Sequence, residues 1–142
     1  MLIFVPEVAQ VLAQIYRVLR PAGCLVTSET DQETFLVDSP FPETSRKLFD
    51  ALAQSMPHRH LGRELPRLLA AAGFHNVRLF PRVVYPPFNM FEQIFSAVLR
   101  ESIEKGVVSH QEASEWFEAM READRVGTYV FCITVFTALG QK

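Results

Sequence analysis

The stretch YRVLRPAGCLVTSETD, Tyr16–Asp31, decides the fold of this chain. It has the pattern of a helix end, a stop at Pro21 and Gly23, and a buried strand. Apolar residues recur at helical spacing across residues 8–19, and the apolar run LIFV at 2–5 is compatible with a strand. A strand, a helix and a second strand joined by a short turn predict a right-handed crossover between two parallel strands.

The rest of the chain alternates helical and strand patterns. SHQE at 109–112 is a capping box, in which Ser109 and Glu112 satisfy the first backbone donors of a helix. The run TYVFCITVFTALG at 128–140 is apolar on both faces, which predicts a central strand covered by helices. The remaining elements are expected as helices near 45–55, 63–72 and 89–105 and a strand over 76–85, with Pro81 near the sheet edge.

Composition bounds the class of protein. The chain has 142 residues, of which 49% are apolar and twelve are Phe, and we expect it to form one domain over residues 1–142. Its 14 basic and 16 acidic residues give a net charge of −2 without long runs of either sign, so nucleic acid and membrane are not expected partners. The N-terminus lacks a signal-peptide pattern and the longest apolar run is shorter than a bilayer span, which predicts a cytoplasmic protein.

The residues that commonly carry catalysis or bind metals form no recognisable constellation. Cys24 and Cys132 lie in apolar, strand-like runs and are expected to be reduced core thiols. Four scattered histidines offer no metal-ligand spacing with them, so no metal site is predicted. The Gly-x-Ser-x-Gly pattern of a nucleophile elbow is absent as well, and the sequence identifies no catalytic residue.

Two segments and the last strand carry a resemblance to a known family. They are YRVLRPAGCLV at 16–26, LPRLLAAAGFHNVRL at 65–79 and the final YVFCITVFTALGQK. In this order they resemble the C-terminal half of class I S-adenosylmethionine-dependent methyltransferases, in the ubiquinone/menaquinone-biosynthesis-like, methyltransferase type 11 branch. The resemblance implies an α/β fold with a partial Rossmann-like sheet of about four strands. The last strand is expected to be antiparallel and inserted between two others, with helices on both faces and a helical insertion at about 86–126.

The resemblance also implies that the cofactor-binding half of the family's fold is missing. That half holds S-adenosylmethionine with a glycine-rich loop, in which residues without a Cβ let the backbone approach the cofactor. The six glycines of this chain form no such loop, because the nearest two, Gly62 and Gly73, are 11 positions apart. Only Phe4 and Val5, in the segment that matches the family's fourth strand, correspond to part of the cofactor site. The chain is therefore expected to be a truncated methyltransferase that does not bind the cofactor alone.

Substrate contacts are expected in two places. Ligands of open α/β sheets bind outside the carboxyl ends of strands, where Glu29, Thr30 and Asp31 would orient a polar group or accept a proton. Alternatively, these residues cap the next helix or face solvent. The resemblance also places a lid over the substrate in the helical insertion, where Phe88 and Phe91 would suit an apolar or aromatic molecule. Aromatic residues at helical spacing are more often part of an ordinary core.

An unprotected sheet edge predicts a partner. Without the strands that precede it in the family, Leu2–Val5 becomes an apolar edge strand with no Lys, Pro or charge. We expect this edge to form a homodimer around a two-fold axis, or to bind an N-terminal partner chain that completes the sheet. Three functions remain open: an incomplete methyltransferase acting on a small molecule, a non-catalytic dimerising remnant, and an α/β domain that binds an apolar ligand.

Overall fold

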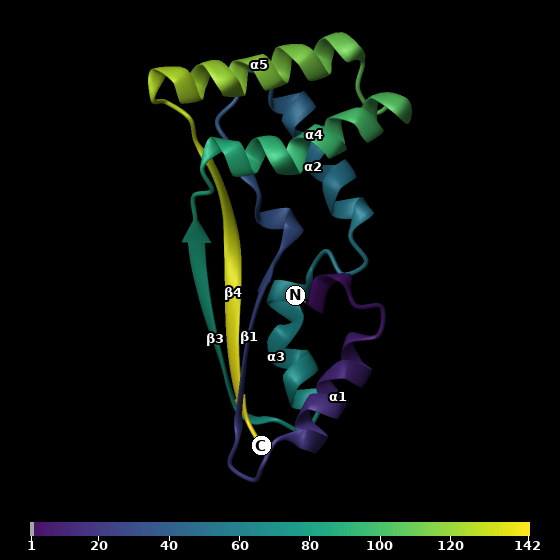
Figure 1. Ribbon diagram of the computed structural model, residues 1–142, viewed down its shortest axis with the longest axis vertical. Helices are drawn as coiled ribbons and strands as arrows, with labels where there is room; N and C mark the ends of the chain where they lie inside the picture. Colours follow the sequence, from purple (N-terminus) through teal and green to yellow (C-terminus); the bar gives the residue numbers. More distant parts are fainter. Residues whose placement is uncertain (1) are drawn as a thin grey trace. The chain divides into compact units, whose positions relative to one another are not determined.

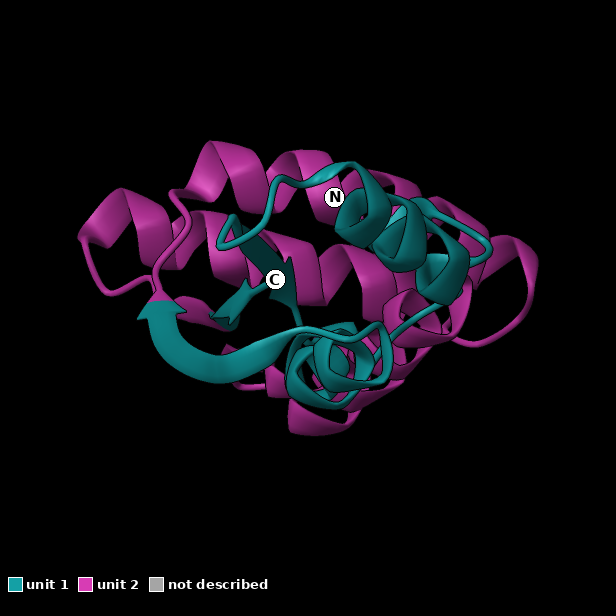
Figure 2. Ribbon diagram, turned by 90° about the horizontal axis from the view of Figure 1, so that it is seen from below, with its two compact units in different colours: residues 1–31, 56–83, 134–142 teal, residues 32–55, 84–133 magenta. Residues whose placement is uncertain are grey.

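The computed structural model describes residues 2–142, which form five α-helices and a four-stranded sheet. The described chain divides into two compact units, and each is considered by itself (Figure 2). Unit 1 contains residues 1–31, 56–83 and 134–142, and unit 2 contains residues 32–55 and 84–133. The predicted α/β fold class is confirmed, whereas the assignment of residues 1–142 to a single domain stays a prediction.

The sheet of unit 1 is built around the last strand of the chain. Strand β4 (Phe131–Gln141) pairs antiparallel with β1 (Cys24–Thr30), so that Cys24 lies opposite Gln141 and Thr30 opposite Val135. Strand β3 (His75–Val84) pairs with β4 on its other side (Figure 1). The antiparallel last strand between two others is therefore confirmed. Pro81 lies in β3 at the sheet edge, where a missing backbone donor is tolerated.

Two helices of unit 1 cover one face of this sheet (Figure 1). They are α1 (Val8–Val18) and α3 (Leu61–Ala71), and both carry the apolar stripe expected from the sequence. Gly73, at a φ of 99°, ends α3, because its N–H bonds to the carbonyl of Ala70 and the next N–H returns to Leu69. The buried core of unit 1 consists of Ile3, Val8, Leu12, Leu61, Leu65, Leu69, Phe74 and Ala138.

The N-terminal segment is not the predicted strand. Leu2–Phe4 form a short 3-10 helix, η1, and the Val5 N–H bonds back to the Leu2 carbonyl at 2.9 Å. The N–H groups of Leu2 and Ile3 bind the carboxylate of Glu29, so they are not available for a strand ladder. The prediction of a Leu2–Val5 edge strand, parallel to residues 24–29, is therefore wrong. Within residues 2–142 the sheet edge is β1 itself, which pairs with β4 alone.

The face of the sheet that α1 and α3 do not cover is open to solvent in unit 1, so the expectation of helices on both faces is not met there. Alternation along β1 places Cys24 and Val26 on this face, and Val26 is 60% exposed. Phe80 of β3 is also 50% exposed. The expectation that both cysteines are core thiols is thus wrong, since Cys24 is exposed and Cys132 is half-buried.

Unit 2 holds the remaining helices, α2 (Pro42–Ser55), α4 (Phe88–Glu104) and α5 (His110–Val126), with the 3-10 turn η2 (Gln32–Thr34) and the two-residue strand β2 (Leu36–Val37). The helical insertion predicted at about 86–126 corresponds to α4 and α5. The predicted capping box starts α5, because Ser109 Oγ accepts from the Glu112 N–H at 3.1 Å and the Glu112 carboxylate accepts from the Ser109 N–H at 2.7 Å.

Candidate functional site

The carboxyl end of β1 carries a buried acid that holds the N-terminal segment. The Glu29 side chain is 2% exposed, and its carboxylate accepts hydrogen bonds from the Leu2 N–H at 2.5 Å and the Ile3 N–H at 3.4 Å. His58 Nε2 lies 2.9 Å from the carbonyl of Val5. Glu29, a predicted substrate residue, is thus brought together with the segment that carries the predicted cofactor residues. In this structure its carboxylate stabilises that segment.

Asp31 is fully buried and paired with a cation. Arg63, near the start of α3, donates two hydrogen bonds to its carboxylate, one from Nε to Oδ2 and one from Nη2 to Oδ1 at 2.9 Å. A fork of two parallel bonds is the strong form of the arginine–carboxylate pair. Thr30 lies opposite Val135 in the β1–β4 ladder. Both acids are thus buried rather than facing solvent, and their role toward a substrate stays a prediction.

The two predicted cofactor residues differ in accessibility. Phe4 is 62% exposed, and Val5 is half-buried with its carbonyl bound by His58. The cofactor role of both residues also stays a prediction.

The predicted lid residues lie in the aromatic core of unit 2. Phe91 is 0% exposed, and its ring centroid lies 4.6 Å from that of Phe95 and 5.4 Å from that of Trp116. Phe88 is half-buried and stacks on Phe91 at 5.8 Å. Burial raises the pKa of the neighbouring Tyr129 above its ordinary value. The structure brings Phe88 and Phe91 together in this packing, and their role toward a substrate stays a prediction.

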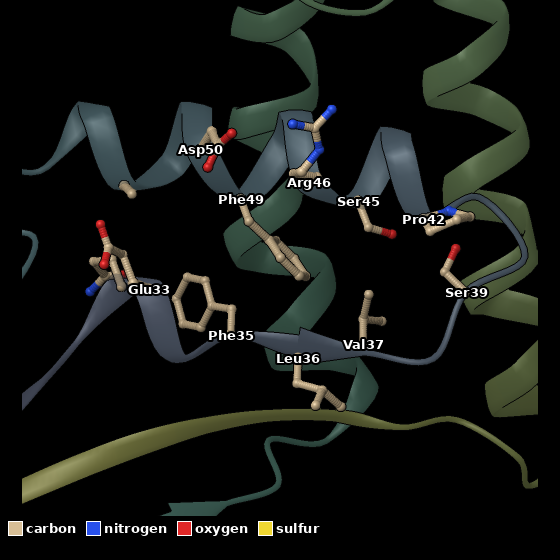
Figure 3. A pocket seen from close by; sticks show the side chains of 12 residues that line it. Glu33, Phe35, Leu36, Val37, Ser39, Pro42, Ser45, Arg46, Phe49 and Asp50 are labelled. Atoms are coloured by element: carbon tan, nitrogen blue, oxygen red, sulfur yellow. The ribbon is translucent and has the colours of Figure 1, made fainter.

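A pocket of about 410 Å³ lies within unit 2, between α2 and the segment that contains η2 and β2 (Figure 3). None of the predicted site residues lines it. Its apolar part is formed by the rings of Phe35 and Phe49, whose centroids are 5.7 Å apart at 64°. The pocket is lined by Gln32, Glu33, Phe35, Leu36, Val37, Ser39, Pro42, Ser45, Arg46, Phe49, Asp50 and Ala53.

Charged side chains stand around the rings of the pocket. Figure 3 shows Glu33 and Asp50 at one end, with the two rings between them and Ser39 at the other end. The Arg46 guanidinium also lines the pocket, but it donates to Glu43 at 2.5 Å, and this bond raises the pKa of Arg46. The site therefore combines an aromatic surface with carboxylates, one cation that is already paired, and a small volume.

The hydroxyl of Ser45 is committed to the fold. It donates to the Phe41 carbonyl at 3.1 Å and accepts from Trp116 Nε1 at 2.8 Å. Sequence reasoning missed this pocket because its lining comes from a loop and a helix that share no periodic pattern. The available signal was the pair of Phe residues flanked by acids in the stretch from 33 to 50.

The described part of the chain contains neither a cluster of metal ligands nor a helix suited to a membrane. Among residues 2–142, no group of three or more His, Cys, Asp or Glu side chains is placed to hold a metal ion. None of the helices within this range has the length and apolar character needed to cross a membrane.

Comparisons with known proteins identify distant similarities. No family model matches the chain. Over 71 residues it is 39% identical to the "Uncharacterized 37.1 kDa protein in transposon TN4556" of Streptomyces fradiae, a match that covers 49% of this chain and 21% of that protein.

Among solved structures, the chain is similar to "Phospholethanolamine N-methyltransferase 2" of Haemonchus contortus, in complex with phosphomonomethylethanolamine and S-adenosylhomocysteine. The TM-score is 0.39 and the identity 11%, over 99% of this chain and 31% of that one. At this distance the likeness assigns no role to any residue. The chain spans 21% of the Streptomyces protein and 31% of the methyltransferase chain.

Proposed function

We propose that this chain is the substrate-side part of an S-adenosylmethionine-dependent methyltransferase that acts on a small apolar or aromatic molecule. The observation that carries the proposal is the position of β4, antiparallel between β1 and β3. The sequence resemblance implies this arrangement for the last strand of the methyltransferase sheet. The motifs that carry the resemblance, at 16–26 and 65–79, lead into β1 and β3, the two neighbours of β4.

The glycines of the chain support a cofactor site that is completed elsewhere. Gly62 and Gly140 are held in tight packing, because an added Cβ would lie 2.6 Å from Phe136 Cδ2 and 2.9 Å from Phe74 Cβ, respectively. The others end helices or form turns, three of them with positive φ. With each glycine engaged in packing or a turn, the main contacts to S-adenosylmethionine would come from another polypeptide segment, with Phe4 at the boundary.

The edge of β1 is where such a segment would attach. Within residues 2–142 β1 pairs on one side only, and its sequence from Cys24 to Thr27 contains no charge, Pro or Lys to block pairing. A strand that carries the glycine-rich loop would continue the sheet from this edge. A homodimer through the same edge, in place of the Leu2–Val5 edge predicted from the sequence, is the alternative for this surface.

Calorimetry with the cofactor distinguishes a methyltransferase completed by another segment from a non-catalytic homodimer. The chain alone and the chain co-expressed with the polypeptide encoded immediately upstream are each titrated with S-adenosylmethionine and S-adenosylhomocysteine by calorimetry. Micromolar binding by the pair alone, with transfer of labelled methyl groups to a small-molecule acceptor, is the expected result. Micromolar binding by the isolated chain would overturn the claim that the cofactor site is completed elsewhere. A stable homodimer that binds no cofactor in either form would favour the non-catalytic remnant.

A second function, binding of a small ligand without catalysis, is favoured by the pocket in unit 2. All of its lining residues come from this chain, so ligand binding there needs no second polypeptide. In that case the isolated chain binds small aromatic molecules, and neither preparation transfers a methyl group.

A further inference from the structure

We infer that the pocket of unit 2 binds a small organic cation, an ammonium group carried on a compact apolar body. Binding itself does not depend on methyl transfer. If the chain is part of a methyltransferase, this ligand is its methyl acceptor, and that part of the inference rests on the proposed function. The inference is carried by the charge, the aromatic lining and the size of the pocket.

The charges around the pocket favour a cation. Glu33 and Asp50 contribute two carboxylates at one end, and Arg46 is the cation of the lining. The guanidinium of Arg46 hydrogen-bonds to Glu43, which does not line the pocket. Among residues 2–142 the Asp50 carboxylate accepts no hydrogen bond, although it lies close enough to raise the pKa of Arg46 slightly. The lining thus carries two formal negative charges and one positive charge, and Asp50 supplies the carboxylate that a cationic ligand would meet.

The aromatic rings favour the same kind of ligand. Phe35 and Phe49 are half-buried, line the pocket and meet edge to face at 5.7 Å. The face of an aromatic ring is electronegative and attracts an ammonium group placed over it. The rings also accept an apolar body by contact, which a strongly hydrated inorganic cation does not provide. Rings and carboxylates together select an organic cation.

The size of the pocket limits the ligand. Its volume of about 410 Å³ lies at the low end of the range of about 300–1,000 Å³ that is common for small-molecule sites. A single ring with a short aminoalkyl chain fits this volume, whereas a nucleotide or a long lipid does not. An anionic ligand would face the carboxylates of Glu33 and Asp50 and would have to compete with Glu43 for Arg46.

The experiment compares three probes of equal shape and different charge. These are 2-phenylethylamine, 2-phenylethanol and 3-phenylpropionate, titrated into the full chain by calorimetry and by amide NMR without any cofactor. We expect the amine to bind about tenfold more tightly than the alcohol, and the anion to bind least. Amide shifts should concentrate at residues 33–50. Because ions screen the exposed carboxylates, added salt should weaken binding of the amine and leave binding of the alcohol unchanged.

Three variants test whether the preference for the amine arises at this pocket. Asp50→Asn should weaken the amine about fivefold and leave the affinity for the alcohol unchanged. Arg46→Gln should increase the affinity for the amine about twofold, since it removes a nearby positive charge. Asp38→Asn, an exposed acid of the same unit that does not line the pocket, is the matched control and should have no effect on either probe.

Three results would overturn the inference: no binding of the amine, equal binding of the amine and the alcohol, or tightest binding of the anion with loss in Arg46→Gln. The outcome is independent of the calorimetry with S-adenosylmethionine. Amine binding without cofactor binding by any preparation would leave the ligand site intact and refute the methyltransferase proposal. Cofactor binding and methyl transfer without amine binding would support the methyltransferase proposal and refute the ligand site.

Discussion

Replacement of Glu29 tests whether the acid at the end of β1 is a structural clamp. Its carboxylate is buried and accepts from two backbone N–H groups of the N-terminal segment, at 2.5 Å from Leu2 and 3.4 Å from Ile3. Glu29→Ala leaves both donors without this partner. Glu29→Gln keeps an oxygen for the shorter bond and turns an N–H₂ group toward the longer one. The two variants should therefore destabilise the chain to different extents.

The magnitude follows from these contacts. A hydrogen bond to a charged group contributes about 1.5–3 kcal/mol, and the 3.4 Å bond to Ile3 is expected at or below the lower limit. The free energy lost in Glu29→Ala has an upper limit, because the N-terminal segment can detach. In that case the burial of Ile3, about 2 kcal/mol, is lost instead. We therefore expect Glu29→Ala to lower the free energy of unfolding by about 2 kcal/mol and Glu29→Gln by about 1 kcal/mol.

Urea unfolding followed by far-UV circular dichroism measures the free energies, and amide exchange measures protection of residues 2–6. Glu7→Ala is the matched control, since this exposed acid of the same segment makes no capping hydrogen bond and should change stability by less than about 0.5 kcal/mol. A Glu29→Ala chain as stable as the control, with residues 2–6 still protected, would refute the clamp. Increased stability would instead favour the substrate role, because functional acids are commonly held at a cost in stability.

Three further changes test the packing and the caps. Gly62→Ala should lower the free energy of unfolding by about 2 kcal/mol in urea, because the new Cβ would lie 2.6 Å from the Phe136 ring and this outweighs the better helix propensity of Ala; unchanged stability would contradict the close packing. The backbone hydrogen bond from Ser109 lowers the pKa of Glu112 from its ordinary 4.5 to about 2, so its stabilisation is present above pH 4.5 and is lost as the pH falls toward 2; the difference in stability between wild type and Glu112→Gln should vanish over that window, and a constant difference would refute the assignment. Trp116→Phe should cost about 2 kcal/mol in thermal or urea unfolding, since it leaves a void and removes the indole hydrogen bond to α2; a loss below about 0.5 kcal/mol would show that the site relaxes.

Local signals predicted the α-helices and the strands β1, β3 and β4, but not the structure of residues 2–5. The stop at Gly73 and the capping box at Ser109 act through residues within a few positions of each other, so the sequence carries them directly. The central place of β4 follows from its apolar character on both faces and from the resemblance. These features depend on local geometry or on an element's overall hydrophobicity, which a single sequence records.

Features that depend on distant partners were not predictable. LIFV has a strand composition, but its backbone donors are taken by Glu29, 26 and 27 positions away, and no local pattern indicates this. Helical spacing places Phe91 on one face of a helix, but only its distant neighbour Trp116 and the nearby Phe95 show that its ring is packed inside unit 2. The pocket around Phe49 arises from the packing of a loop against a helix, and no local sequence pattern predicts how closely these two segments pack.

The single tryptophan of the chain has a consequence for how its folding can be observed. Trp116 is buried among the aromatic rings of unit 2, so tryptophan fluorescence, excited selectively at the red edge, reports on that unit alone. A dye coupled to the exposed Cys24 would report on unit 1, since the other thiol is half-buried. The chain thus carries two separate optical probes, and the coincidence or separation of their unfolding curves would measure directly whether its two units melt as one cooperative body.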